Sequence, residues 1–230
     1  MEEAKTINSS CSPTIPLSLP LDCKIRHIPM KRGFDILFSL LCLFIGAPIF
    51  LLIAVAIFAT SPGRIVYSHE RIGRSGKPFR CYKFRTMHEN AEELLQGLLE
   101  SDLALKIEWE KNYKLKKDPR ITRIGLFLRK TSLDELPQFW NVLKGNLSVV
   151  GPRAVVSEEM TKYYHVKAYK ILSIRPGLTG YWQVYGRSDV PSYETRVKMD
   201  EYYVENQSFL LDLKLIAMTI PAMLFARGAY

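Results

Sequence analysis

The sequence predicts a helix-rich α+β protein in which a single membrane-embedded, re-entrant (kinked) helix precedes a compact domain with short strands. Three observations favour this class. A run of 24 residues from Ile36 to Ala59 carries no charge. Residues 79–84 alternate in the manner of a strand, and much of the later chain has helical spacing of apolar residues. The apolar stretch 209–225 contains two charges and a proline, which predicts an interfacial C-terminal helix and not a second span.

The composition narrows the class of partner. The chain has 230 residues, enough for one sizeable domain plus an appendage, and a net charge of +9. Such a charge suits anionic lipid, nucleotide phosphate or nucleic acid. The four cysteines show neither a CxxC pair nor metal spacing, which indicates reduced thiols. Residues 1–23 are polar and contain several serines and prolines, so they predict a disordered lead and not a signal peptide.

Residues 24–60 form the predicted membrane segment, which is long enough to cross a bilayer because a span needs about 20 apolar residues. Pro48 lies at its centre and favours a kink. Lys and Arg flank the segment on both sides, whereas a spanning helix usually shows an asymmetry. A bent helix that enters and leaves one leaflet fits both observations, and an ordinary single span is the alternative. Asp35 is expected to face headgroups or to pair with Arg32.

The segment 61–230 is predicted to form one compact domain. A turn at residues 61–63 precedes two short strands, 65–67 and 79–84, with Gly73 and Gly76 suiting a hairpin between them. Residues 89–112 are expected to be one charged helical stretch with an apolar side. Residues 121–129 fit either a strand or a short helix. Further helices are predicted over 134–143, ended by Gly145, and over 155–173 and 193–206.

The adjacent carboxylates Asp134 and Glu135 are the first candidates for chemistry. The alternative is structural, because Ser132-x-x-Glu135 matches a capping box worth about 1 kcal/mol. Pro137 favours a helix that starts at Asp134, since its missing N–H then costs little. We therefore expect the helix dipole to lower the pKa of Asp134. An ionised carboxylate beside a bound phosphoryl group is a competent nucleophile.

Basic side chains near these carboxylates favour phosphate as the reacting group. A guanidinium grips phosphate with two parallel hydrogen bonds. Phosphoryl transfer depends on positioning and on charge neutralisation, often by Mg²⁺, which Asp134 would bind with help from Glu135 or Asp118. The sequence contains neither a Walker A pattern nor G-x-G-x-x-G. The candidate phosphate-binding residues are Lys83, Arg85, Arg120, Arg129 and Arg153.

A series of short motifs then identifies a family. In chain order they include Lys31-Arg32-x-Phe34-Asp35, Glu70-Arg71-x-Gly73, Tyr82-Lys83-Phe84-Arg85-Thr86-Met87, Asp118-Pro119-Arg120, Arg129-Lys130-Thr131-Ser132-Leu133-Asp134-Glu135-Leu136-Pro137-Gln138 and Gly151-Pro152-Arg153. Together these motifs resemble the bacterial sugar transferases, the monotopic polyprenyl-phosphate phosphoglycosyl transferases. The resemblance runs over some 200 residues, from Lys31 to the C-terminus, and is closest to the undecaprenyl-phosphate galactose phosphotransferase branch, with only the catalytic domain expected here.

The resemblance implies an enzyme with a two-step reaction. Asp134 would attack the sugar-linked phosphate of a UDP-hexose and release UMP, and undecaprenyl phosphate would then take the sugar phosphate. Glu135 would support the site, the arginines and Lys83 would hold phosphates, and Mg²⁺ would be the cofactor. The family also implies a bacterial inner membrane protein with its catalytic domain on the cytoplasmic face, in exopolysaccharide, capsule or O-antigen synthesis. Ala154 departs from the family pattern, where many relatives have a proline.

Two alternatives from other classes remain at the level of the sequence. One is a membrane-surface binding or scaffolding protein that uses the basic face and the apolar helix only for attachment to lipid. The other is a nucleic-acid binder, which the charge favours but for which no recognition motif exists. Galactose 1-phosphate is expected as the transferred group, with glucose 1-phosphate next, and a homodimer is left open.

Overall fold

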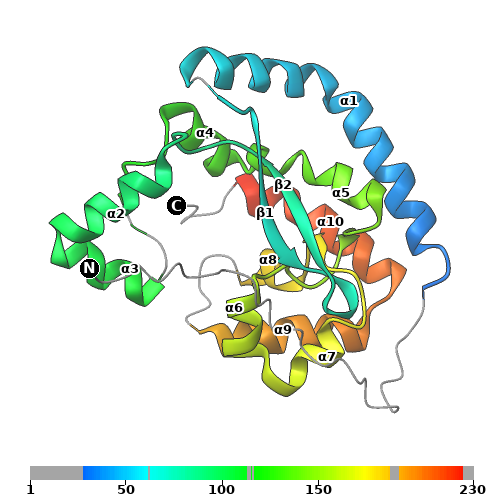
Figure 1. Ribbon diagram of the computed structural model, residues 1–230. Helices are drawn as coiled ribbons and strands as arrows, with labels where there is room; N and C mark the ends of the chain where they lie inside the picture. The colour runs from blue at the N-terminus through cyan, green and yellow to red at the C-terminus, as the bar shows by residue number, and fades with distance from the viewer. Residues whose placement is uncertain (1–27, 62, 113–114, 116, 187–191, 225–230) are drawn as a thin grey trace, which may run out of the picture.

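The computed structural model of the protein describes residues 28–224, apart from 62, 113–114, 116 and 187–191. The predicted disordered lead, 1–23, lies outside the described residues. The fold is helix-rich α+β, as predicted, and it contains two small two-stranded sheets among the described residues. A long apolar helix arches over the remaining elements (Figure 1).

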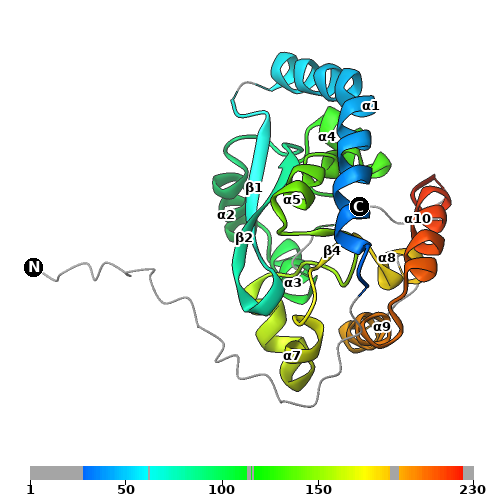
Figure 2. The same cartoon turned by 90° about the vertical axis from the view of Figure 1, so that its right-hand side faces the viewer.

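Helix α1 (Lys31–Thr60) is the predicted apolar helix, and it contains Pro48. Two perpendicular views show that it is bent near its middle (Figures 1 and 2), which confirms the predicted kink. Among the described residues it is the one helix long and apolar enough to cross a membrane. Only 11% of its most apolar window is buried, so α1 is not the core helix of a soluble protein.

Both ends of α1 are held by the rest of the fold. At its start Lys31 forms an ion pair with Asp212, and Arg32 donates to the carbonyl oxygens of Val142 and Leu143 at 2.7 and 3.0 Å. Past its end the carbonyl oxygen of Ser61 accepts a hydrogen bond from Arg85. The two ends of this 30-residue helix, about 45 Å apart along its axis, therefore both contact the rest of the same domain.

The expectation for Asp35 is wrong. Its side chain is buried, and its Oδ1 accepts hydrogen bonds from the Val149 backbone N–H at 3.0 Å and from the Ser148 hydroxyl at 3.1 Å. These two donors satisfy a carboxylate that would be costly in lipid, so neither headgroups nor Arg32 are needed.

The predicted hairpin is confirmed. Strands β1 (Val66–Ile72) and β2 (Pro78–Phe84) pair antiparallel, with Val66 opposite Phe84 and Ile72 opposite Pro78. The turn η1 (Arg74–Gly76) joins them, and Gly76 adopts a φ of 73°, which glycine tolerates without strain. The two strands of the hairpin run side by side across the domain (Figure 1).

The charged helical stretch consists of two helices, α2 (Ala91–Ser101) and α3 (Leu103–Asn112). The break falls at Asp102, whose Oδ1 accepts the backbone N–H groups of Ala104 at 2.8 Å and Leu105 at 3.2 Å and so starts a new helix. The ambiguous segment 121–129 resolves as a helix, α4 (Arg123–Thr131), with Thr122 as its N-cap.

A short parallel pair was not predicted. Strands β3 (Ser148–Val150) and β4 (Gly177–Thr179) have three residues each, too few to show alternation in the sequence. Gly177 permits the pairing, because a Cβ there would lie 2.1 Å from the backbone nitrogen of Gly151. The pairing continues into the Gly151-Pro152-Arg153 turn, where Arg153 forms a bridge with Gly177.

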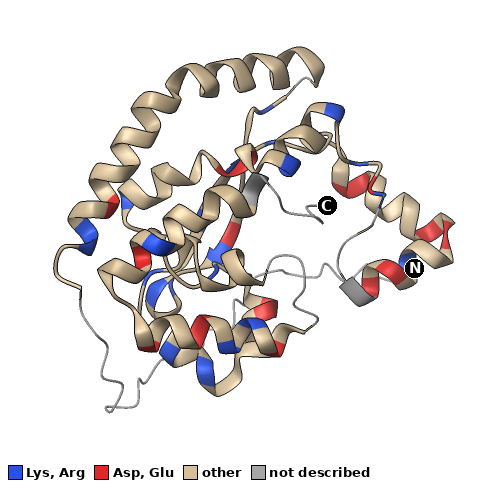
Figure 3. Ribbon diagram, turned by 180° about the vertical axis from the view of Figure 1, so that it is seen from behind, with Lys and Arg blue, Asp and Glu red and all other residues tan. Residues whose placement is uncertain are grey.

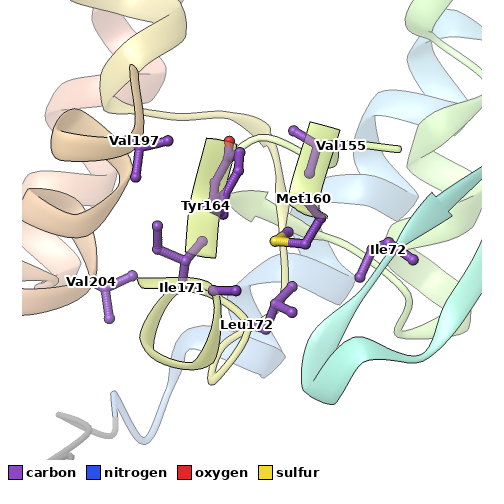
Figure 4. Packing of buried hydrophobic residues seen from close by; sticks show 9 residues of the cluster. Ile72, Val155, Met160, Tyr164, Ile171, Leu172, Val197 and Val204 are labelled. Atoms are coloured by element: carbon purple, nitrogen blue, oxygen red, sulfur yellow. The ribbon is translucent and has the colours of Figure 1, made fainter. Parts of the chain in front are cut away.

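The predicted helix over 155–173 is broken into short pieces. They are α6 (Ser157–Glu159), the π-helical turn η3 (Met160–Tyr164), the 3₁₀ turn η4 (His165–Lys167) and α7 (Ala168–Ile171). The break follows from His165, which has a φ of 41°. The pieces nevertheless bury their apolar side chains in one cluster with Val197 and Val204 (Figure 4).

Three helices complete the described chain: α8 (Tyr181–Tyr185), α9 (Tyr193–Asn206) and α10 (Phe209–Leu224). Helix α9 confirms the predicted boundaries, and α10 follows the predicted C-terminal helix. In α10 Leu210 and Ile220 are exposed, whereas Leu215 is fully buried. This helix is therefore docked by one side and presents apolar side chains on another.

Candidate active site

Asp134 and Glu135 lie in a 3₁₀ turn, η2 (Leu133–Glu135), between α4 and α5 (Gln138–Lys144). The predicted helix start at Asp134 is wrong, because α5 begins after Pro137. The capping-box alternative also fails, since Ser132 has a φ of 56° and its side chain does not cap the turn. Gly145 ends α5 with a φ of 83°, as predicted.

Lys83 joins the two carboxylates. Its Nζ lies 2.6 Å from Glu135 Oε1 and 3.6 Å from Asp134 Oδ2. Lys83 comes from β2, so the antiparallel hairpin positions this cation against the turn. Burial alone would lower the pKa of Lys83, but Glu135 and Asp134 outweigh it and the pKa is raised.

The environment of Asp134 reverses the expected pKa shift. Asp134 is only 7% exposed, and burial raises the pKa of its carboxyl group above the ordinary value. Lys83 and Arg129 oppose this effect, and the Glu135 carboxylate adds to it. Since Asp134 does not start an α-helix, the dipole that was expected to lower its pKa is missing. Its charge therefore depends on the neighbouring cations.

Arg129, at the end of α4, is one of those cations. Its Nε donates a 2.9 Å hydrogen bond to Thr86 Oγ1, which fixes the plane of the guanidinium. Burial lowers the pKa of Arg129, and Asp134 and Asp118 partly restore it. Thr86 was missed as a site residue, although it follows Arg85 in one of the motifs.

Two further arginines complete this basic group. Arg153 acts electrostatically on Lys83, and its guanidinium lies 5.2 Å from the centre of the Trp182 ring. Arg71, from β1, acts on Glu135 and hydrogen-bonds the Ala154 carbonyl oxygen at 3.5 Å. Sequence reasoning missed Arg71 as a site residue, although it stands in the Glu70-Arg71-x-Gly73 motif.

Of the other two predicted cations, Arg120 acts electrostatically on Arg129 and so lies near this group, whereas Arg85 contacts the end of α1. Arg120 forms two hydrogen bonds with Asp118, at 2.8 and 2.7 Å, and stacks on Trp109 at 4.9 Å. Arg85 is buried and donates to Ser61 at the end of α1. Both form structural contacts, although Nε and Nη1 of Arg85 are buried without a hydrogen-bond partner among the described residues. A phosphate contact by either stays a prediction.

Asp200, in α9, accepts a hydrogen bond from the backbone of Arg153. Sequence reasoning missed it as a site residue. Its Oδ1 accepts the Arg153 backbone N–H at 3.4 Å, and its Oδ2 accepts the Tyr164 hydroxyl at 3.2 Å. Burial raises the pKa of Asp200 to about 7, against the effect of these hydrogen bonds. No motif marked Asp200, because an acidic residue on a charged helix usually faces solvent.

The Asp134 and Glu135 carboxylates can hold a magnesium ion only together with further oxygen ligands. The described residues contain no group of three acidic, histidine or cysteine side chains placed to bind a metal. Mg²⁺ is usually bound by one or two carboxylates plus substrate phosphates. The Asp134–Glu135 pair fits that pattern, whereas Asp118 is occupied by Arg120.

The site lies next to the end of α1. Leu133 and Leu136, on either side of the carboxylates, pack against a cluster of α1, β2 and α4 residues, namely Ile53, Ile57, Phe84 and Leu128. Figure 3 shows charged residues on α1 only near its start, so the helix end above the site is apolar. This arrangement can hold a phosphorylated compound at the border of an apolar layer and attack it with a carboxylate.

Comparisons with known proteins agree with this chemistry. Residues 26–226 match a family model described as bacterial sugar transferase. The exopolysaccharide production protein ExoY of Sinorhizobium fredii is 48% identical over 200 residues, 87% of this chain and 88% of that protein. The undecaprenyl-phosphate galactose phosphotransferase of Salmonella typhimurium is 47% identical over 87% of this chain. The UDP-glucose:undecaprenyl-phosphate glucose-1-phosphate transferase of Escherichia coli is 34% identical over 95%. The chain spans only 42% and 45% of the last two proteins.

Proposed function

The chain belongs to the bacterial sugar transferase family, and from this premise we propose that it transfers hexose 1-phosphate from a UDP-hexose to undecaprenyl phosphate. The relatives are named as phosphotransferases and sugar-1-phosphate transferases, which supports an enzyme of this class. The observation that carries the proposal is the buried Asp134 carboxylate, 3.6 Å from Lys83 and within the field of Arg129.

The reaction has two displacements at one phosphorus atom. In the first, an Asp134 carboxylate oxygen bonds to the sugar-linked phosphorus, the bond to the bridging oxygen of the diphosphate breaks, and UMP leaves. In the second, an oxygen of undecaprenyl phosphate bonds to the same phosphorus and the acyl-phosphate bond breaks. The Asp134 carboxylate is regenerated, and the product is undecaprenyl-diphosphate-hexose.

The cations stabilise the charge that moves during both steps. Lys83, Arg71, Arg129 and Arg153 supply four positive charges against the Asp134 and Glu135 carboxylates, while Glu159 acts on Arg71 and the Asp118–Arg120 pair acts on Arg129. Cations therefore outnumber carboxylates in this group. A diphosphate brings two or more negative charges and is therefore the ligand this group suits. Glu135 holds Lys83 in place, because it is the nearer of the two carboxylates.

Asp134 and Glu135 would hold Mg²⁺ together with phosphate oxygens of the substrate. When bound, the ion would neutralise negative charge on the diphosphate. The proposal is supported by a pair of adjacent carboxylates at the border of a group of cations.

The helix α1 would bring the lipid acceptor to this site. Both of its ends contact the same domain, which favours a re-entrant helix in one leaflet of the inner membrane, with the domain on the cytoplasmic face. The phosphate of undecaprenyl phosphate would then reach Asp134 beside the apolar helix end. The relative ExoY is named as an exopolysaccharide production protein. We propose the same pathway for this chain.

Galactose 1-phosphate is the proposed transferred group and glucose 1-phosphate the second choice. The relative named for galactose is 47% identical, whereas those named for glucose are 34% and 35% identical. The two sugars differ at one hydroxyl group, so a few side chains decide between them.

An assay of UMP release tests the proposal. The purified chain is incubated with undecaprenyl phosphate, Mg²⁺ and a panel of UDP-sugars, and UMP is measured. We expect release with UDP-galactose and a loss of about a thousandfold or more in Asp134→Asn. The exposed Glu93→Gln variant of α2 is the matched control and should keep wild-type activity. Full activity of Asp134→Asn would remove Asp134 as the nucleophile, and a lack of UMP from every UDP-sugar would refute the function.

A further inference from the structure

A cavity of about 410 Å³ lies at the turn of the hairpin, away from the Asp134 carboxylate. Its walls come from the turn and the first residues of β2, from the end of α5 and from the segment before β4. Three of its lining residues, Arg74, Lys77 and Arg175, are cations, and none of the nine is acidic.

The guanidinium groups around this cavity are held by backbone carbonyls. Arg74 Nε donates to the Ser173 oxygen at 3.1 Å, and Arg175 Nε donates to the Gly145 oxygen at 2.8 Å. A single backbone contact fixes each guanidinium and leaves its remaining N–H groups able to bind a ligand.

A fourth cation, Arg32 of α1, lies next to the part of the cavity wall that the end of α5 forms. A Cβ on Gly145 would lie 3.5 Å from Arg32 Nη2, so this guanidinium reaches the end of α5 beside the cavity. Arg32 and Arg74 both act on Arg175, whose pKa is lowered by burial and by these two like charges.

The positive charge of this group is not balanced within the described chain. None of the ion pairs among the described residues includes Arg32, Arg74, Lys77 or Arg175. Asp35 is the one carboxylate among the described residues that acts on Arg175, and it offsets one of the four positive charges. Gathering four like charges costs free energy that a bound anion would recover.

We propose that this cavity binds the phosphate group of an anionic ligand, as a second anion site separate from the Asp134 site. The separation has two supports. Phe79 lines the cavity and lies four residues before Lys83 on β2, a distance of about 13 Å along a strand. The groups that act on Arg175 and those that act on Asp134 have no member in common.

Two sources could supply such a phosphate: a lipid headgroup, which the start of α1 brings near through Arg32, or a free phosphate compound in solution. Arg74 and Lys77 are exposed, so either source has access. Both sources present a tetrahedral phosphate group, a dianion or a monoanion, which guanidinium groups bind with paired hydrogen bonds.

Calorimetric titration of the detergent-purified full chain with inorganic phosphate, at constant ionic strength, tests the site. The double variant Arg74→Gln/Lys77→Gln removes two exposed cations of the cavity. The matched control, Lys106→Gln/Lys198→Gln, removes two exposed lysines of α3 and α9. We expect the cavity variant to bind phosphate about tenfold more weakly or worse, and the control to bind as the wild type does.

Lys83→Gln separates this site from the Asp134 site and should retain the phosphate binding that the cavity variant loses. Cavity and control variants that bind phosphate equally would overturn the proposal, as would loss of that binding in Lys83→Gln alone. Flotation with phosphatidylcholine vesicles, with and without phosphatidylglycerol, then identifies the source. A lipid headgroup requires the cavity variant to lose phosphatidylglycerol-dependent binding beyond the control, whereas equal flotation of both variants assigns the site to a free phosphate compound.

Discussion

The carboxylate of Asp35, near the start of α1, accepts a 3.0 Å hydrogen bond from the backbone N–H of Val149 in β3. Strand β3 leads directly into the turn that carries Arg153. This bond therefore links the position of the apolar helix to the position of a cation in the candidate active site.

Asp35→Ala should lower the free energy of unfolding by about 2 to 4 kcal/mol, because it leaves a buried N–H and the Ser148 hydroxyl without an acceptor. Denaturant unfolding in detergent measures the change. Ser39→Ala is the matched control on the same helix, since the Ser39 hydroxyl is buried without a hydrogen-bond partner in the described chain. It should change stability by no more than about 0.5 kcal/mol, and equal losses in both variants would contradict the role of Asp35.

Lys83→Gln should lower the rate of UMP release by about tenfold to a hundredfold and move the acidic limb of the pH–rate profile to higher pH. The reason is electrostatic: Lys83 lowers the pKa of Asp134, so its removal lets that pKa rise further and protonates the proposed nucleophile at a higher pH. The profile of kcat/KM against pH measures this. Lys83→Arg keeps the charge and should leave the limb in place; a limb that stays put in Lys83→Gln would show that another group controls it.

Arg129 and Arg120 should respond in opposite ways to the same substitution. Arg129→Gln should reduce UMP release about a hundredfold with little loss of stability, because Arg129 acts on Asp134. Arg120→Gln should cost about 3 kcal/mol of stability, because it leaves the Asp118 carboxylate without its partner. Activity and thermal unfolding measured on both variants distinguish them, and the reverse pattern would exchange their roles.

Asp200 should make stability depend on pH. Its pKa is about 7 in the folded protein against an ordinary value of 3.8, so the folded state binds a proton that the unfolded state has released. The free energy of unfolding should therefore fall as pH rises from about 4 to about 7, by at most about 1.4 kcal/mol per pH unit from this group. Asp200→Asn keeps a similar shape and should flatten this part of the curve, and an unchanged difference between pH 5 and pH 8 would refute the assignment.

The sequence predicted those parts of the fold that depend on local pattern. The hairpin, α9 and the kinked apolar helix follow from alternation, helical spacing and one proline. It could not predict the short parallel pair β3–β4, which depends on a close approach at Gly177. Nor could it predict the break at His165, where tertiary packing imposes a positive φ on a residue within a helical pattern.

The sequence predicted most residues of the candidate site but not the direction of the pKa shift of Asp134. Asp134, Glu135, Lys83, Arg129 and Arg153 come together from four different elements, as the motifs suggested. The pKa of Asp134 was expected to be lowered and is raised, because burial depends on Leu133, Leu136 and the helix above them and cannot be read from neighbours in the chain. Arg71 was missed because its approach to Glu135 follows from the folding of the hairpin.

The ion pair between Lys31 and Asp212 joins residues 181 positions apart. During synthesis the apolar helix emerges long before its partner exists, so the start of α1 acquires its final anchor only when α10 has been made. Contacts of such high sequence separation form late and slow the folding of a chain. A ribosome-bound intermediate would thus hold the start of α1 through Arg32 and Asp35 before the ion pair with Asp212 can form, which makes the docking of α10 the last step in fixing this helix.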